Sequence, residues 1–238
     1  MKLLLGSPKL QTEFEFTLPQ QKKAVANLPL ARKMNYEINK LGVYLSGGLD
    51  SAALLCLILA ELQATNNQDN YLVHCFIIDK NEGQAQHALN VIKEAERIFD
   101  VNINFDMYNN EPNDYTKPGR ISNTVYKKIS DQYTGMMFYQ GLNDIPSADI
   151  KTFNSTFEGY KNLTEHSSLS NKPAHFPFLK LHKPQILDIF YKLNCESVIQ
   201  YTQSCTRKPS GQCGECYWCE ERSWAFNMLS KTDPQLKS

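Results

Sequence analysis

One stretch in the first quarter of the chain constrains the fold more than any other. The segment from Leu41 to Leu55 reads as an apolar strand, a Ser-Gly-Gly turn and an apolar helix. Gly47 and Gly48 let the backbone turn tightly and approach a ligand without a Cβ in the way. Asp50 and Ser51 then occupy the first helical turn, where free N–H groups and the helix dipole favour an anion. We interpret the turn as a phosphate-binding loop; an ordinary strand-turn-helix with a Ser or Asp cap is the alternative.

The chain after this turn alternates between strand and helix patterns. Strands are predicted at 43–45, 71–78, 101–105 and 136–139, and helices at 50–62, 84–99, 121–132 and 184–193. This alternation predicts an α/β fold with a doubly wound, mostly parallel sheet, because parallel strands need crossover connections. Ligands of such sheets bind beyond the carboxyl ends of the strands. Ser46, Asp79 and Gly141 each follow a predicted strand, so we expect them at one site.

Two segments fit this pattern less well. Residues 142–175 are polar and rich in Asn, Ser and Thr, and a stretch of this length without secondary structure predicts a functional lid or disorder. Residues 1–40 precede the loop and contain a predicted strand at 14–18 and a predicted helix at 20–32. No function can be assigned to this extension; an added edge hairpin and an oligomer contact are the two interpretations.

Charge and hydropathy exclude several classes of partner. The 25 acidic and 25 basic residues cancel, so no net field attracts nucleic acid or anionic lipid. No run approaches the ~18 apolar residues of a membrane span, and Met1–Leu5 is too short for a signal peptide. We therefore expect a cytoplasmic protein with neither a membrane nor a nucleic-acid partner.

The seven cysteines fall into two groups. Three lie in apolar runs and are expected to be buried free thiols: Cys56, Cys75 and Cys195. Four others crowd into fifteen residues: Cys205, Cys213, Cys216 and Cys219. Four thiolates at these spacings suit tetrahedral zinc, and a site filled by protein ligands is structural rather than catalytic. An iron–sulfur cluster, another redox role and plain buried thiols are the alternatives.

The phosphate loop also carries a resemblance to a known superfamily. Ser46-Gly47-Gly48-Leu49-Asp50-Ser51 resembles the Ser-Gly-Gly-x-Asp-Ser signature of the PP-loop ATP pyrophosphatases. Members of that superfamily bind the phosphates of ATP at this loop, adenylate an acceptor oxygen and release pyrophosphate. The loop is not of the Walker type, because no Gly-Lys-Ser/Thr follows it.

Further motifs narrow the resemblance to 7-cyano-7-deazaguanine synthase, the QueC family. The segment from Pro177 to Ile186 resembles a family pattern that includes Lys183. Ser204-Cys205, the following three cysteines, Arg222 and Ala225-Phe226 resemble the zinc-binding end of the family. Asp79 with Gly83-Gln84 and His87, and Gly141 with Asn143, loosely match two other family motifs. The resemblance extends from about Gly42 to Phe226.

This resemblance implies a reaction and a set of site residues. The reaction converts 7-carboxy-7-deazaguanine, a small deazapurine acid, and ammonia into the nitrile through an acyl-adenylate, with ATP, Mg²⁺ and Zn²⁺ as cofactors. Ser46, Asp50 and Lys183 are the implied catalytic residues. The implied nucleotide-binding residues are Ser46, Gly47, Gly48, Leu49, Asp50, Ser51, Asp79, Gly141 and Lys183. Family members are often homodimers. The implied domains are an ATP-binding domain over 41–195 and a zinc-binding tail over 196–238, after the extension at 1–40.

Several alternatives stay open at this stage. Residues 144–151 depart from the family's acceptor-binding segment, so a second hypothesis keeps the ATPase and transfers the acyl group to another amine, on a protein or a nucleic acid. A third is a non-catalytic nucleotide-binding module. Single residues also have two interpretations each: Asp50 binds Mg²⁺ or caps the helix, and Asp79 contacts ribose or a metal or only forms a turn.

Four further side-chain assignments are weighed against plain structural roles. Lys183 contacts phosphate or faces solvent, and Arg222 meets the leaving phosphate or packs beside the zinc site. His74 and His182 are expected to be structural rather than catalytic. The two tryptophans, Trp218 and Trp224, are expected to cover the zinc tail rather than to stack on a base.

Overall fold

A computed structural model describes residues 2–4, 11–13, 40–79, 83–110, 123–144, 166–169 and 172–237, and every structural statement below refers to these. Within them, none of the helices is long and apolar enough to cross a membrane. The predicted strand at 14–18 and the predicted helix at 20–32 lie outside the described residues. Two short strands, β1 (Lys2–Leu4) and β2 (Gln11–Glu13), pair with each other in antiparallel fashion.

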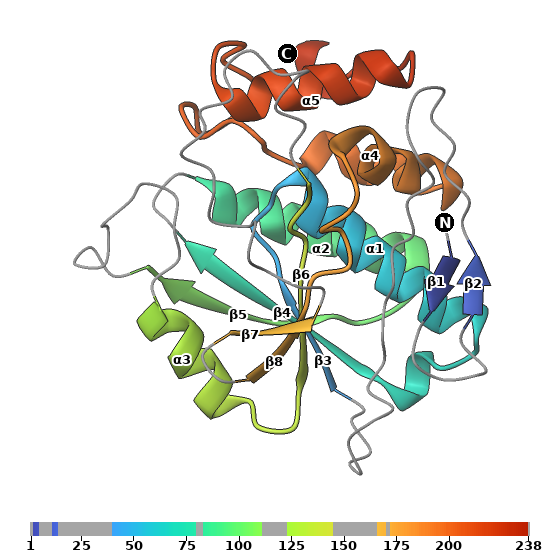
Figure 1. The fold of residues 1–238 in the computed structure, drawn as a ribbon, viewed down its shortest axis with the longest axis vertical. Helices are drawn as coiled ribbons and strands as arrows, with labels where there is room; N and C mark the ends of the chain where they lie inside the picture. Colours follow the sequence, from blue (N-terminus) through green and yellow to red (C-terminus); the bar gives the residue numbers. More distant parts are fainter. Residues whose placement is uncertain are drawn as a thin grey trace.

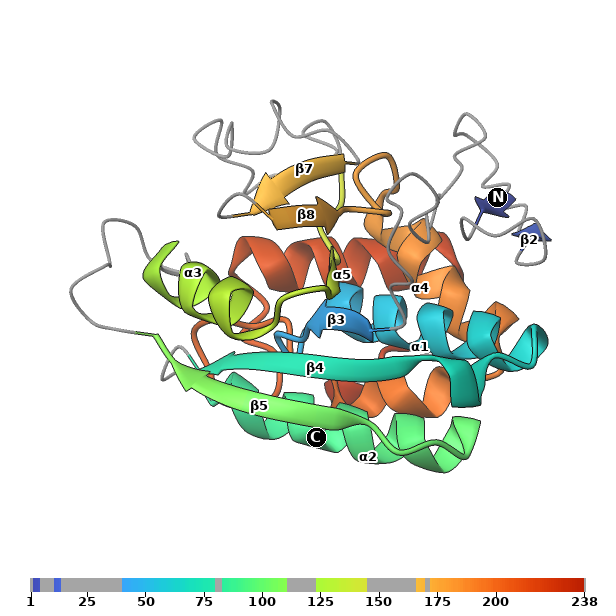
Figure 2. The same ribbon diagram turned by 90° about the horizontal axis from the view of Figure 1, so that it is seen from below.

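The centre of the fold is a sheet of five parallel strands with one antiparallel strand at its edge. Its strand order is β5-β4-β3-β6-β8-β7. Figure 2 shows β5 and β4 at one edge of the sheet and β8 and β7 at the other. The strands are β3 (Lys40–Tyr44), β4 (Leu72–Asp79), β5 (Asn104–Asn109), β6 (Met137–Gln140), β7 (His166–Leu169) and β8 (Lys172–His175). Both neighbours of β3 are parallel to it. The order reverses at β3, because β4 and β5 lie on one side of it and β6 on the other.

Helices cover both faces of this sheet. Alternate strand residues such as Val43 and Cys75 pack with α1 (Leu49–Ala64) and α2 (Gln84–Phe99) on one face. Residues such as Tyr44 and Phe76 pack with α3 (Asn123–Gln132) on the other. This alternation follows from the two-residue period of a strand. The prediction of a doubly wound, mostly parallel α/β sheet is confirmed.

The C-terminal helices add further layers on the α1 side. Helix α4 (Lys183–Lys192) packs against α1, and α5 (Tyr217–Met228) packs against α4, as Figure 1 shows. The 3₁₀ helices are η1 (Gln68–Asn70), η4 (Glu196–Tyr201) and η5 (Pro234–Lys237). Helix α1 is apolar around most of its circumference, because the sheet covers one side and α4 the other.

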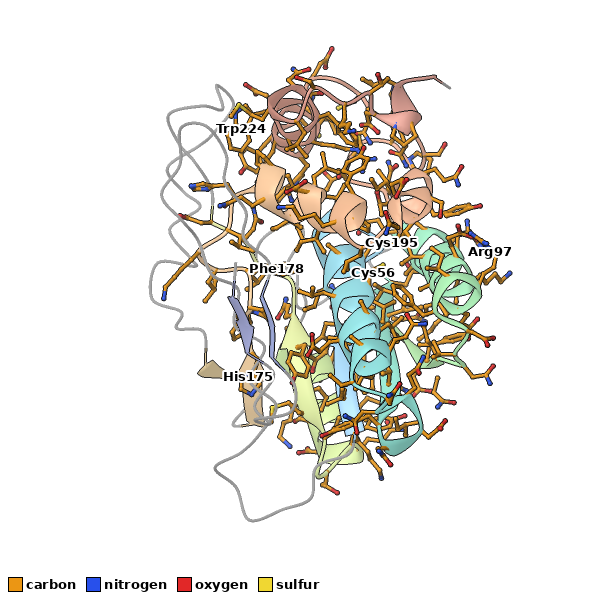
Figure 3. All side chains as sticks on the ribbon, turned by 90° about the vertical axis from the view of Figure 1, so that its right-hand side faces the viewer. Cys56, Arg97, His175, Phe178, Cys195 and Trp224 are labelled. Carbon is orange, nitrogen blue, oxygen red and sulfur yellow. The ribbon has the colours of Figure 1, made fainter. Side chains whose placement is uncertain are left out.

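The three isolated cysteines are buried, as predicted. Cys56, Cys75 and Cys195 are free thiols with no exposed surface. Cys56 of α1 is hydrogen-bonded with Cys195, which follows α4, and Figure 3 shows these two side chains together. They belong to the core between α1 and the C-terminal helices.

Two parts of the sheet differ from the prediction. The strand predicted at 101–105 is observed at Asn104–Asn109, because it pairs with the last six residues of β4, from His74 to Asp79. The segment 142–175 was predicted to lack secondary structure, but it contains the β7–β8 hairpin, and β8 extends the sheet beside β6. The polar sequences of β7 and β8 carry no apolar alternation, so strand pairing rather than pattern places them there.

Candidate active site

The Ser-Gly-Gly turn lies at the carboxyl end of β3, where the strand order of the sheet reverses. Ligands of doubly wound sheets bind at such a point. Strand β3 ends at Tyr44 and α1 begins at Leu49, so residues 45–48 form the turn. Ser46 is exposed at its tip. The side chain of Leu49 is buried in the core, so this residue can offer a ligand only its backbone N–H.

Hydrogen bonds within the turn fix its shape. The Ser51 hydroxyl accepts the Ser46 N–H at 3.1 Å, lies 3.1 Å from the Ser46 hydroxyl and donates to the Gly48 carbonyl at 3.2 Å. The N–H of Ala52 also donates to the Gly48 carbonyl, at 3.1 Å, and begins the helix. The carbonyl of Gly48 therefore faces the helix, and the free N–H groups of the first turn are left for an anion.

Glycine is required at two positions of this site. Gly47 has φ +76°, and a Cβ there would lie 2.5 Å from the carbonyl oxygen of Gln84 at the start of α2. Gly141 follows β6, and a Cβ on it would lie 2.8 Å from the carbonyl oxygen of Asp50. Both glycines permit a backbone approach that no larger residue allows. The structure thus brings Gly141 against the first turn of α1.

Asp79 is the last residue of β4, the strand next to β3. Its backbone carbonyl accepts the N–H of Asn110 at 2.9 Å. Its position at the same edge of the sheet as the turn agrees with the expectation that it shares the site with Ser46 and Gly141.

A buried ion cluster lies beside the first turn of α1. The Lys183 ammonium donates to Asp50 Oδ2 at 2.5 Å and lies 3.0 Å from Glu221 Oε2. Asn143 Nδ2 donates to Glu221 Oε1 at 2.8 Å. Lys183 and Glu221 are 3% and 0% exposed. The cluster joins the N-termini of α1 and α4 to α5 and to the segment after β6.

This geometry decides two of the open assignments. Lys183 does not face solvent, because it is buried between two carboxylates. Asp50 does not cap α1, because the helix has no side-chain cap and Oδ2 of Asp50 accepts the Lys183 ammonium. The second oxygen, Oδ1, is buried and has no hydrogen-bond partner among the described residues.

The two buried charges shift each other's protonation equilibria. Burial opposes the charge on Lys183, but the carboxylates of Asp50 and Glu221 outweigh it and raise the pKa of Lys183. Burial also raises the pKa of Glu221, with a further contribution from Asp50, while Lys183 and Asn143 oppose that shift. Lys183 therefore remains a cation at neutral pH, which suits it to bind phosphate and not to act as a base.

Sequence reasoning missed Glu221. The residue lies four positions before Ala225 and one before Arg222, on the side of α5 that is buried. In a helix, residues four positions apart lie on the same face, so the small apolar Ala225 places Glu221 on a face that can be buried. A carboxylate on such a face is a signal that could have identified it.

The remaining polar candidates have structural contacts. Arg222 is 1% exposed, donates to both carboxylate oxygens of Asp233 at 2.7 and 2.9 Å, and packs over the Phe226 ring. His74 is 3.1 Å from Asp106 on the α3 face of the sheet. The ring nitrogen Nδ1 of His182 lies 3.2 Å from the Asp144 carbonyl oxygen, and the backbone N–H of His182 donates to the Gln185 side chain at 2.8 Å. These contacts account for the three side chains without a ligand.

The two tryptophans lie in different surroundings. Trp218 packs against the cysteine cluster, as expected for a residue that covers the zinc tail. Trp224 of α5 instead makes an edge-on contact with the His182 ring, with the two ring centroids 6.3 Å apart.

The four clustered cysteines form a second centre. The sulfur atoms of Cys205, Cys213, Cys216 and Cys219 lie within 4.8 Å of one another, and the Cys216–Cys219 and Cys213–Cys219 separations are 3.4 and 3.8 Å. Four sulfurs around zinc at about 2.3 Å would be separated by about 3.8 Å. The N–H groups of Glu215 and Cys216 point at Cys213 Sγ at 3.4 and 3.3 Å and lower the pKa of that thiol to about 6. The donor set and its spacing fit a zinc ion.

Comparison with known proteins agrees with this arrangement. Residues 143–230 match the family model described as queuosine biosynthesis protein QueC. This part of the chain, somewhat more than a third of its length, is similar to the QueC family. The QueC match includes Asn143, Lys183, Glu221 and all four clustered cysteines, whereas the Ser-Gly-Gly turn precedes it. No curated protein matches the chain.

Proposed function

We propose that the chain is an ATP-dependent ligase of the QueC type that binds ATP at residues 46–51. The observation that carries the proposal is the buried contact of Lys183 with Asp50. It brings a QueC-family cation, from the matched part of the chain, to the first turn of the helix that follows the Ser-Gly-Gly turn. The N–H groups at the start of a helix have no intrahelical partners, and with a permanent cation beside them they are suited to bind a triphosphate.

The proposed reaction begins with attack of a substrate carboxylate oxygen on the α-phosphorus of ATP. The bond between that phosphorus and the bridging oxygen breaks, and pyrophosphate leaves with the electron pair. Ammonia then attacks the acyl carbon, a proton is lost and AMP departs, which leaves an amide. A second ATP activates the amide oxygen in the same way, with release of pyrophosphate and of one N–H proton. Loss of the second N–H proton and departure of that oxygen on AMP then leave the nitrile.

The residues of the chain supply positioning and charge neutralisation in these steps. The N–H groups and hydroxyls of Ser46 to Ser51 hold the phosphates, and Gly141 lets the segment after β6 approach the same helix end. Lys183 neutralises the negative charge that develops on the leaving pyrophosphate. Asp79 and residues 141–144 are proposed to contact the nucleoside and the acceptor.

Two metal ions fit the residues present. The unpartnered buried oxygen of Asp50 is a suitable ligand for Mg²⁺, which prefers carboxylate and phosphate oxygens. Zinc held by Cys205, Cys213, Cys216 and Cys219 would have all four positions filled by protein, so it would stabilise the fold and leave no open coordination position. Such a site contributes on the order of 10 kcal/mol of apparent folding free energy.

The substrate is tested by incubating the purified chain with 7-carboxy-7-deazaguanine, ammonium and ATP. The proposal predicts the nitrile as product. Residues 144–151 depart from the family pattern, and this favours one second candidate, in which the same adenylation serves a different amine. ATP binding without turnover of the deazapurine acid would contradict the substrate assignment, and mass spectrometry of candidate acceptors would then identify the amine.

A further inference from the structure

The carbonyl group of Gly47 is held by a residue of the C-terminal part of the chain. Its oxygen accepts the backbone N–H of Gln203 at 2.8 Å. In a trans peptide the carbonyl and the following N–H point in opposite directions. The N–H of Gly48 therefore points away from Gln203, towards the open side of the turn, where it lies 3.3 Å from the Ser46 hydroxyl. The direction of one N–H of the phosphate loop thus depends on Gln203.

The side chain of Gln203 holds a different segment. Its amide nitrogen lies 3.3, 3.0 and 2.8 Å from the carbonyl oxygens of Cys205, Lys208 and Gly211. These residues belong to the zinc-site loop, which we define as residues 205–213, from the first clustered cysteine to the second. Gln203 is 1% exposed. One buried residue therefore contacts the phosphate turn through its backbone and the zinc-site loop through its side chain.

His87 of α2 makes a second connection to the same loop. One ring nitrogen lies 3.0 Å from the Tyr201 carbonyl oxygen, and the other lies 3.0 Å from that of Pro209. The imidazole ring therefore lies between the backbone of η4 and that of the zinc-site loop. His87 also adjoins the turn, since a Cβ on Gly47 would lie 3.1 Å from the Cβ of His87.

We propose that the zinc-site loop, through Gln203 and His87, holds the Gly47–Gly48 turn in its phosphate-binding shape. Gln203 and His87 are then positioning residues, and the zinc site acts on the phosphate loop as well as on the C-terminal tail. Four thiolates on one ion would fix the zinc-site loop at Cys205 and Cys213. The carbonyl groups of Cys205, Lys208 and Gly211 in that loop would then fix the Gln203 side chain. The predicted effect on ATP affinity rests on the proposed function. The coupling between the zinc-site loop and the Gly47–Gly48 turn does not depend on it.

The test compares variants that keep the size of the side chain. Gln203→Glu removes the donor and places a carboxylate against three carbonyls, Gln203→Met removes the donor without a charge, and His87→Phe keeps a ring without donors. Gln86→Glu is the matched control, because Gln86 is an exposed glutamine on α2 that bonds only with Asn90 in the described structure. Each protein is measured for zinc content, for amide hydrogen exchange of a peptide covering residues 45–51 without ATP, and for ATP affinity.

The expected result is one zinc per chain in every variant and about three- to tenfold faster exchange at residues 45–51 in the Gln203 and His87 variants, with a similar loss of ATP affinity. Removal of zinc from the wild-type chain should speed exchange at the same residues while a peptide from the buried strand β4 keeps its slow exchange, which separates local release of the turn from global unfolding. Gln86→Glu should change nothing. Unchanged exchange at 45–51 in Gln203→Met and His87→Phe, or after zinc removal, would overturn the proposal. If one variant fails to fold, the other two variants and zinc removal still test the proposal.

The same data separate this inference from the proposed function. A wild-type chain that does not bind ATP but shows the expected exchange pattern would contradict the proposed function and support the coupling. Normal ATP affinity and normal exchange in the variants would contradict the coupling and leave the proposed function standing.

Discussion

The Lys183 ammonium nitrogen lies 2.5 Å from Oδ2 of Asp50, across 133 positions of sequence. The same nitrogen is 3.0 Å from Glu221, so one buried cation faces two carboxylates from two other helices. A buried charge is retained when it is paired and hydrogen-bonded. This contact joins the first turn of α1, which follows the Ser-Gly-Gly turn, to the QueC-matched C-terminal part of the chain.

Replacement of Lys183 by Met should impair both stability and activity. The change leaves two buried carboxylates without their cation, so we expect unfolding free energy to fall by about 3–5 kcal/mol. Adenylation should fall by at least about a hundredfold, because the developing charge on pyrophosphate loses its partner. Urea denaturation and pyrophosphate release measure the two effects. Lys192→Met is the control on the same helix, and it removes a partly exposed ion pair with Asp188. An equal effect of both changes would contradict the account.

Replacement of Gly47 by Ala should abolish ATP binding while zinc stays bound. The new Cβ would meet the Gln84 carbonyl at 2.5 Å and would force a left-handed backbone on a residue that disfavours it. Gly135→Ala is the matched control, because Gly135 also has a positive φ, +75°, but a Cβ there would meet nothing within 4 Å. Calorimetric titration with ATP should separate the two variants, and ATP binding by Gly47→Ala would show that the turn does not hold the phosphates.

The Arg222–Asp233 ion pair should stabilise the fold without acting in catalysis. Both side chains are 1% exposed, and Asp233→Asn leaves the Arg222 charge buried without its carboxylate. We expect a loss of about 3–5 kcal/mol in unfolding free energy, with the ATP affinity of the remaining folded protein unchanged. Glu215→Gln breaks the exposed Arg207–Glu215 pair and should leave stability unchanged. If fully folded Asp233→Asn protein bound ATP more weakly than the wild type, Arg222 would again be a candidate ligand of phosphate.

The contribution of Glu94 to stability should depend on pH. Its carboxylate accepts hydrogen bonds from Arg97 and from Ser197, and these lower its pKa below 4.5 although burial opposes the shift. A carboxyl group whose pKa is lower in the folded state contributes its stability above the unfolded value and loses it as pH falls through the folded value. Glu94→Gln should therefore cost about 1 kcal/mol at pH 7 and progressively less below pH 4.5. A difference that grows as the pH falls would contradict the assigned contacts.

Much of the sheet and of both centres could be predicted, because local pattern determines them. The helix predicted at 84–99 is observed as α2 with those bounds, since Gly83 precedes a regular apolar period that ends at Phe99. The four clustered cysteines converge as expected, because short spacings confine them to one region. The β7–β8 hairpin could not be found in this way, because its polar residues become strands only by pairing beside β6.

Side chains whose environment comes from distant elements were the harder part. The sequence left a solvent-facing Lys183 open as the alternative to a phosphate contact, and only the carboxylates from α1 and α5 exclude it. Glu221 belongs to no recognisable sequence motif. Gln203 contacts Gly47 only because the C-terminal segment folds back onto α1 and α2. Such contacts depend on tertiary packing, which a local pattern does not encode.

The most direct test of the central claim is the fate of ATP labelled at its α-phosphate, incubated with the zinc-loaded chain, 7-carboxy-7-deazaguanine and ammonium. The account predicts labelled AMP with an equal amount of pyrophosphate, formed only when the acid is present and lost in Ser46→Ala and Asp50→Asn. Labelled ADP with inorganic phosphate, or AMP formation that survives both substitutions, would contradict it.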